Sequence, residues 1–222
     1  MQPTLCRADG ARSNRAHDMK LLYAPTSPFV RKVMVCAHLS GQAERIAWLD
    51  SAAHPVRRDE RIAAHNPLAK VPTLVLDDGQ SLYDSRVICE YIDSLGSAGI
   101  FPAAGPARWT ALTRQALGDG LLDAALLARY EHTARPPGLQ WPVWRESLLT
   151  KVAACLQSIE AIAPALATAR PTIGEIALGC GLGYLDFRFP ELDWRASHPA
   201  AARWYAGFAQ LPAMQATLPH DA

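Results

Sequence analysis

Residues 26–33 read TSPFVRKV, and this stretch decides the fold of the first part of the chain. A short apolar run at residues 20–24 precedes it, as expected of a buried strand. Hydroxyl residues followed by Pro28 are typical of the start of a helix. Apolar residues then recur at helical spacing as far as Gly41, which ends the predicted helix. The sequence therefore predicts a strand that leads directly into a helix, with Ser27 at the helix start.

The next elements predict a small sheet of mixed direction. Residues 45–50 form a second strand, and the β-branched run at residues 71–76 forms a third. An acidic turn ending in glycine, at residues 77–79, leads to a short returning strand at residues 81–83, and a helix follows from residue 84. A helical crossover favours a parallel first pair of strands, and the tight turn favours an antiparallel last pair.

The second part of the chain is predicted to be helical. Residues 98–106 are rich in glycine, alanine and proline and form the predicted linker. The predicted fold is thus α/β plus all-α, with a mixed domain at residues 19–97 and a helical domain at residues 107–222. The sequence TIGE at residues 172–175 predicts a capping box. One helix carries an apolar stripe made of Leu148, Val152, Cys155, Leu156, Ile159 and Ile162.

Composition excludes several classes of protein. The net charge is +1, which gives no electrostatic reason to expect nucleic acid or a membrane surface as a partner. The five cysteines include no C-x-x-C pair, which favours a reduced, cytoplasmic protein. The seven histidines show no metal-binding spacing, so no metal is expected. Residues 1–18 lack both hydrophobic periodicity and a signal-peptide core, and they are expected to be a disordered extension or the product of a start codon placed too early.

Three places offer candidate binding groups, and each has a plainer explanation. A hydroxyl at Ser27 can donate a hydrogen bond to a thiolate at a helix N-terminus, where the helix dipole also favours negative charge, or it can simply cap the helix. Pro72 can follow a cis peptide bond that exposes the backbone of Val71, or it can be an ordinary trans proline. Asp84 and Ser85 can hold the ammonium and carboxylate of an amino acid, or they can cap the next helix.

Taken in order, these stretches resemble a known family. SPFVRKV at residues 27–33, NPLAKVP at residues 66–72 and the Asp84-Ser85 pair are similar to the three glutathione-site motifs of the cytosolic glutathione transferases. The likeness is nearest to the bacterial YibF-like proteins and is of the serine type. It implies a thioredoxin-like first domain, glutathione as co-substrate and a homodimer. It also implies glutathione-binding roles for Ser27 at the sulfur, Val71 before a cis proline at the cysteinyl backbone, Asp84 and Ser85 at the γ-glutamyl end, and Lys70 and Phe29 near the glycyl end and the mouth.

The resemblance has departures and an alternative. Tyr23 lies near the place of the tyrosine used by other classes, but its position within the strand suits core packing.

The expected activity is conjugation of the glutathione thiol to an apolar electrophile, with Arg129, Tyr130 and Trp109 as candidate pocket residues. The alternative is a member of the same fold that binds glutathione or a protein without turnover. The glycine-rich stretch at residues 179–183 is expected to serve close helix packing rather than nucleotide binding.

Overall fold

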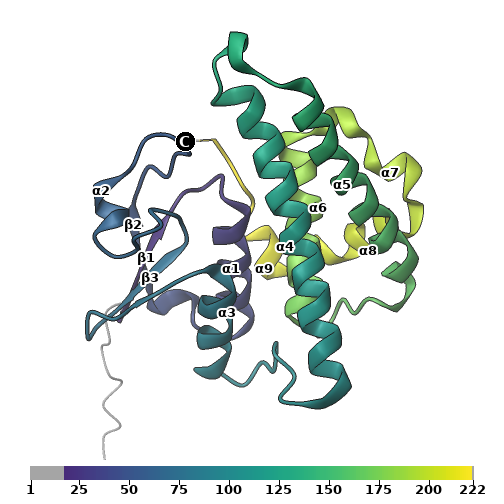
Figure 1. Cartoon of the computed structure of the whole chain (residues 1–222). Coiled ribbons are helices and arrows are strands. Elements are labelled where there is room, and N and C mark those ends of the chain that lie inside the picture. Colours follow the sequence, from purple (N-terminus) through teal and green to yellow (C-terminus); the bar gives the residue numbers. More distant parts are fainter. Residues whose placement is uncertain (1–17, 222) are drawn as a thin grey trace, which may run out of the picture.

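The computed structural model describes residues 18–221 and shows a small sheet domain packed against a set of helices (Figure 1). The strands are β1 (Met19–Tyr23), β2 (Ile46–Asp50), β3 (Thr73–Leu76) and β4 (Ser81–Leu82). The helices of the first domain are α1 (Pro28–Leu39), α2 (Glu60–Ala63) and α3 (Ser85–Ser94). Those of the second domain are α4 (Gly105–Thr133), α5 (Pro142–Ile162), α6 (Ile173–Arg188), α7 (Trp194–Ser197), α8 (Pro199–Phe208) and α9 (Pro212–Gln215). The described 3-10 turns are η1 (Ala43–Arg45), η2 (Pro137–Leu139), η3 (Ala163–Ala165) and η4 (Pro190–Leu192).

The expected disordered extension at residues 1–18 falls outside the described residues except for its last member. Asp18 is described, and its carboxylate accepts a hydrogen bond from Nε of Arg45 at 3.1 Å. This ion pair fixes the chain just before β1.

The sheet has the strand order β2-β1-β3-β4. β1 and β2 are parallel, with Met19 opposite Ile46, and β3 is antiparallel to both of its neighbours. These directions confirm the predicted pairing. They also place the carboxyl ends of β1 and β4 and the amino end of β3 at the same edge of the sheet. The starts of α1 and α3 and the segment before β3 therefore meet at that edge.

Local sequence signals explain α1 well. The Ser27 hydroxyl accepts a hydrogen bond from the backbone N–H of Val30 at 3.3 Å, and Pro28 occupies the first helical position. The helix ends before Gly41, whose φ of +68° lies in the left-handed region that glycine adopts without a steric penalty. Most of α1 is buried, because it packs against α3 and α6 as well as the sheet.

The helical domain depends on a close crossing of α4 and α6. A Cβ added to Gly118 would lie 2.6 Å from the backbone carbon of Ala177, so only glycine permits this approach. The predicted capping box of α6 is confirmed, because Glu175 accepts a hydrogen bond from the backbone N–H of Thr172 at 2.8 Å. The glycine-rich stretch lies inside α6 and meets neighbouring helices at close range, as expected.

Two predicted boundaries differ from the structure. Helix α4 begins at Gly105, so the last two residues of the predicted linker at 98–106 are helical. The stretch between β2 and β3 was expected to be a loop, but it contains the short helix α2, capped by Asp59.

By length and composition alone, residues 142–165 would be long and apolar enough to cross a membrane. In the structure, one face of this segment packs on α4 through Leu148, Val152, Leu156 and Ile159.

Candidate functional site

The start of α1 carries the first candidate residue. Oγ of Ser27 accepts the capping hydrogen bond from Val30, and no acceptor for the hydroxyl hydrogen occurs among residues 18–221. A serine hydroxyl has one proton to donate in addition to its lone pairs. The two uses weighed from the sequence are thus compatible: Ser27 caps the helix and keeps its proton available for an anion.

The second candidate segment is held in shape by its own side chains. Nδ2 of Asn66 donates to the carbonyl of Lys70 at 3.2 Å and to Oγ1 of Thr73 at 2.9 Å. The bond between Val71 and Pro72 is cis, as the resemblance implied. Lys70 is exposed and Val71 is half-buried, directly before β3. These residues therefore lie at the same sheet edge as Ser27.

The third candidate pair begins α3. The carboxylate of Asp84 accepts a hydrogen bond from the backbone N–H of Arg86 at 2.9 Å, which makes Asp84 the N-cap. Asp84 is exposed, whereas Ser85 is buried. Phe29 is half-buried in the first turn of α1, two residues after the cap, with the ammonium of Lys32 5.8 Å from its ring centre. The topology thus brings the predicted residues to one edge of the sheet.

A cavity of about 230 Å³ lies beside Ser27. One wall is a face of α1, another is formed by Tyr23 and Trp48, and a third by residues that follow α9. The rings of Tyr23 and Trp48 are 4.5 Å apart between centroids. Tyr23 is half-buried against the edge of the core, and it also forms part of the cavity wall. The lining residues are Tyr23, Pro25, Ser27, Val30, Arg31, Met34, His38, Trp48, Ala216, Thr217, Leu218 and His220.

Arg31 is the buried cation of this cavity. Its side chain lies one turn after Ser27, and the residue is 6% exposed. Nη2 donates to the carbonyl of Met214 at 3.2 Å, while Nε has no partner in the described part of the chain. A buried guanidinium with an unused donor, next to a helix N-terminus, favours negative charge in the cavity.

A buried ion cluster joins the two domains beneath this site. Lys32 on α1 is 0% exposed, and its Nζ lies 2.5 Å from Oδ1 of Asp119 on α4, which is 1% exposed. The second oxygen of Asp119 accepts from Nε of Arg86 at 2.9 Å. One turn further along α4, burial and the neighbouring Asp119 charge raise the pKa of Asp123. These aspartates were not predicted from the sequence as part of the site, although a lysine between the buried valines of α1 is a signal that a carboxylate partner is needed.

The three suggested pocket residues do not lie together. Arg129 and Tyr130 are half-buried near the end of α4, where burial raises the pKa of Tyr130. Trp109 is exposed in the first turns of the same helix. Its Cα lies about 31 Å from that of Tyr130 along the helix axis at 1.5 Å per residue. Trp109 therefore does not share a pocket with the other two.

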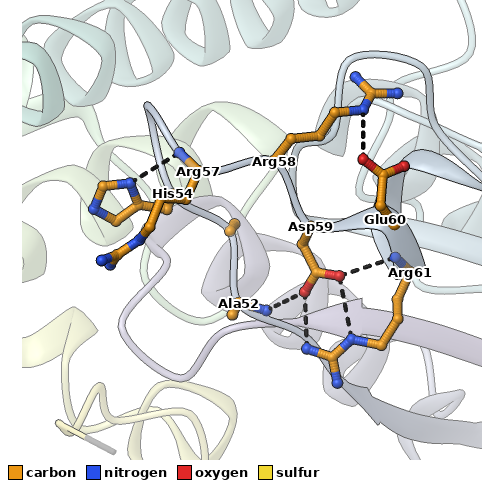
Figure 2. Close-up of a pocket in the computed structure, with 8 residues that line it drawn as sticks. Ala52, His54, Arg57, Arg58, Asp59, Glu60 and Arg61 are labelled. Atoms are coloured by element: carbon orange, nitrogen blue, oxygen red, sulfur yellow. Dashed lines mark hydrogen bonds and ion pairs between the residues drawn. The ribbon is translucent and has the colours of Figure 1, made fainter.

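A larger, more open hollow of about 420 Å³ lies on the loop between β2 and α2. Figure 2 shows that both of its carboxylates, Asp59 and Glu60, face an arginine. Asp59 accepts from the backbone N–H of Ala52 at 2.7 Å and from the guanidinium of Arg61 at 2.8 Å, and Arg58 faces Glu60 at 3.4 Å. These contacts hold the loop in shape and leave no carboxylate free in it for chemistry.

Other reactive groups lie away from the cavity. Cys36, Cys89 and Cys180 are buried, and burial raises the pKa of the Cys180 thiol to about 11. None of the described cysteines lines the cavity beside Ser27. Residues 18–221 contain no group of three or more side chains that could hold a metal ion.

Comparison with known proteins places this two-domain fold in a class. Residues 26–95 match the family model for the glutathione S-transferase N-terminal domain, and residues 142–207 match the model for the C-terminal domain. The uncharacterized GST-like protein YibF of Escherichia coli K12 is 32% identical over 184 residues, which cover 82% of this chain and 89% of that protein. The chain therefore belongs to the glutathione S-transferase family.

Two solved structures of a family member from Pseudomonas fluorescens Pf-5 are also similar. One holds glutathione, is 44% identical and has a TM-score of 0.88. The other holds S-(propanoic acid)-glutathione, is 43% identical and has a TM-score of 0.84. Each comparison covers 91% of this chain and 100% of that one.

Proposed function

We propose that this protein binds glutathione and conjugates it through its thiol to an electrophilic small molecule, with Ser27 stabilising the thiolate. The observation that carries the proposal is the Ser27 hydroxyl, which caps α1, keeps its proton free among the described groups, and lines a cavity. The glutathione held by the similar Pseudomonas fluorescens protein supports the choice of ligand.

The energies are adequate for activation of the thiol. A free thiol has a pKa of about 8.5, and lowering it by about 2 units takes about 2.7 kcal/mol. A hydrogen bond to a charged group contributes about 1.5–3 kcal/mol, and a helix N-terminus adds about 0.3–1 kcal/mol. Arg31, buried one turn below Ser27, adds a further favourable charge. These contributions support the proposed serine-type assignment.

The remaining glutathione contacts follow the sheet edge. We assign the cysteinyl backbone to Val71, the γ-glutamyl end to Asp84 and Ser85, and the glycyl end to Lys70. Phe29 lies at the mouth of the site. The cavity beside Ser27 is the place for the second substrate, and its aromatic and aliphatic lining suits an apolar body. A cytoplasmic homodimer completes the proposal, and gel filtration against standards tests the dimer.

The test measures glutathione binding by calorimetry and the thiolate absorbance of the bound ligand as a function of pH. Ser27→Ala is expected to raise the thiol pKa of bound glutathione by about 1–2 units, because it removes one charge-assisted hydrogen bond. Ser27→Thr retains a hydroxyl and should stay near the wild type. Tyr23→Phe removes a different hydroxyl from the same cavity wall and should leave the thiol pKa unchanged.

The results separate the competing functions. If Tyr23→Phe raises the thiol pKa and Ser27→Ala does not, the tyrosine is the thiol ligand and the serine assignment is wrong. If glutathione binds with an unshifted thiol pKa, and a panel of electrophiles and peroxides gives no turnover, the protein is a glutathione-binding member of the fold without transferase activity. Absence of glutathione binding refutes both functions.

A further inference from the structure

The segment that follows α9 runs from the helical domain toward the loop between β2 and α2 of the first domain (Figure 1). We name residues 216–221 the C-terminal segment. Thr217, Leu218 and His220 of this segment form a wall of the cavity that contains Ser27. Most of the segment is exposed, and Asp221 is 72% exposed at its side chain. A stretch with so little buried surface is held weakly and is easily displaced.

An ion pair with Arg188, the last residue of α6, holds the end of the C-terminal segment. Nη2 of Arg188 lies 2.6 Å from Oδ1 of Asp221. The guanidinium also lies on the ring of Phe187, 3.8 Å from its centre, and the side chain is only 11% exposed. An arginine stacked on a ring is already ordered, so it loses little freedom when it binds a carboxylate.

More positive charge surrounds this place than Asp221 neutralises. The hydrogen bond from Arg188 is the main cause of the lowered pKa of Asp221, and Arg129 on α4 is a further cause. Arg129 has no ion pair with any described carboxylate. Arg31 lines the adjoining cavity with an unused Nε donor. Asp186, two residues before Arg188, accepts hydrogen bonds from Arg195 and from the indole N–H of Trp194.

The distance between the cavity and Arg188 is short. The backbone of α6 touches Arg31 at Gly183, where an added Cβ would collide with the guanidinium. Arg188 follows five residues later, about 7.5 Å further along the helix axis at 1.5 Å per residue and about 140° around it. Its partner Asp221 directly follows His220 of the cavity wall, so an acidic group that displaces Asp221 can extend from the cavity to Arg188.

We propose that Arg188, with Arg129 beside it, binds a carboxylate of the second substrate, and that Asp221 occupies this place in the free protein. The acceptor is then an electrophile that carries an acidic group close to its reactive carbon. This inference rests on the proposed function and adds the chemical class of the substrate. Arg188 is a specificity-determining residue, and the C-terminal segment is an internal competitor for it.

The experiment compares two probes that differ in charge, S-(2-carboxyethyl)glutathione and S-propylglutathione, with glutathione as the reference. Calorimetry with the full chain should show that the wild type binds the acidic probe about tenfold more tightly than the neutral one, since the probe gains a charge-assisted pair in exchange for the weaker, exposed pair with Asp221. Arg188→Gln should bring the ratio to about one and leave glutathione affinity unchanged. Arg195→Gln is the matched control, because this arginine also stacks on an aromatic ring and pairs with an aspartate, and its ratio should equal that of the wild type.

Asp221→Asn tests the competition separately. It should tighten binding of the acidic probe several-fold and leave the neutral probe unchanged, because the internal carboxylate is gone. A wild-type ratio near one, a preserved ratio in Arg188→Gln, or an unchanged acidic-probe affinity in Asp221→Asn overturns the proposal. If Arg188→Gln fails to bind glutathione through misfolding, the wild-type ratio and Asp221→Asn decide. Glutathione binding without an acidic preference refutes only this inference, whereas loss of glutathione binding by the wild type refutes the proposed function itself.

Discussion

The ion pair between Lys32 and Asp119 allows a sharp prediction about how the domains are held together. Both side chains are buried, at 0% and 1% exposure, with the nitrogen and oxygen 2.5 Å apart. Replacing Asp119 with asparagine leaves the ammonium of Lys32 in the interior without a counter-charge. Breaking a buried pair in this way costs about 3–5 kcal/mol of unfolding free energy. For a chain of this size, that corresponds to a fall in Tm of about 6–20 °C.

A matched set of variants distinguishes the cost in unfolding free energy of breaking a buried ion pair from the cost of breaking a partly exposed one. Arg86→Gln removes the other cation that contacts Asp119, but this side chain is half exposed, so its loss should cost less than about 1 kcal/mol. The double replacement Lys32→Met with Asp119→Leu removes both buried charges and should recover most of the loss caused by Asp119→Asn.

Urea unfolding followed by circular dichroism and by tryptophan fluorescence measures these differences. Agreement of the two probes shows whether the two domains unfold together, which the free-energy comparison requires. The reasoning is refuted if Asp119→Asn costs no more than Arg86→Gln. It is also refuted if the double variant is less stable than Asp119→Asn, because the two buried charges would then not depend on each other.

Two further predictions concern packing and pH. Gly118→Ala should destabilise the protein by about 1–3 kcal/mol, because the added methyl group clashes with α6. Gly120→Ala, on the same helix but in open space, should stabilise the protein by about 0.5–1 kcal/mol. Thermal unfolding of the two variants should therefore show changes in Tm of opposite sign. The backbone N–H groups of Ala201 and Ala200 lower the pKa of Glu160, so its contribution to stability is present above its ordinary pKa and is lost as the pH falls through the lowered value. Between about pH 6 and about pH 3, Glu160→Gln should therefore lose less Tm than the wild type, and an equal loss would contradict the assignment.

The sequence predicted the sheet domain because its signals are local. The cap at Ser27, the turn at residues 77–79 and the strand runs each depend on neighbours within a few positions. The candidate glutathione residues follow from the same motifs and their order, and their binding roles stay predictions. The short helix α2 was missed because four residues carry too little periodicity to be distinguished from a loop.

The other contacts around the candidate site could not be predicted from the sequence, because they join residues that are far apart along the chain. Lys32 and Asp119 are 87 positions apart, and Arg188 and Asp221 are 33 positions apart. The position of Lys32 between apolar residues signals that it needs a carboxylate partner, but the sequence does not say which carboxylate that is. Only the crossing of α1, α4 and α6 decides which of these charges are buried and which face the cleft. Trp109, which the sequence left as a pocket residue or an ordinary surface residue, is exposed in the structure.

Helix α1 connects the thiol site to the helical domain through adjacent residues. Ser27 starts the helix, Arg31 donates to the carbonyl of Met214, and Lys32 binds Asp119 on α4. The hydroxyl that we assign to the thiolate is thus fixed at one end of a rod that two buried cations attach to the other domain. A shift of α4 or α9 relative to the sheet therefore moves the hydroxyl as well as the cavity wall. In the function that we propose, glutathione at the sheet edge and the second substrate in the cavity beside Ser27 are therefore coupled through this one helix.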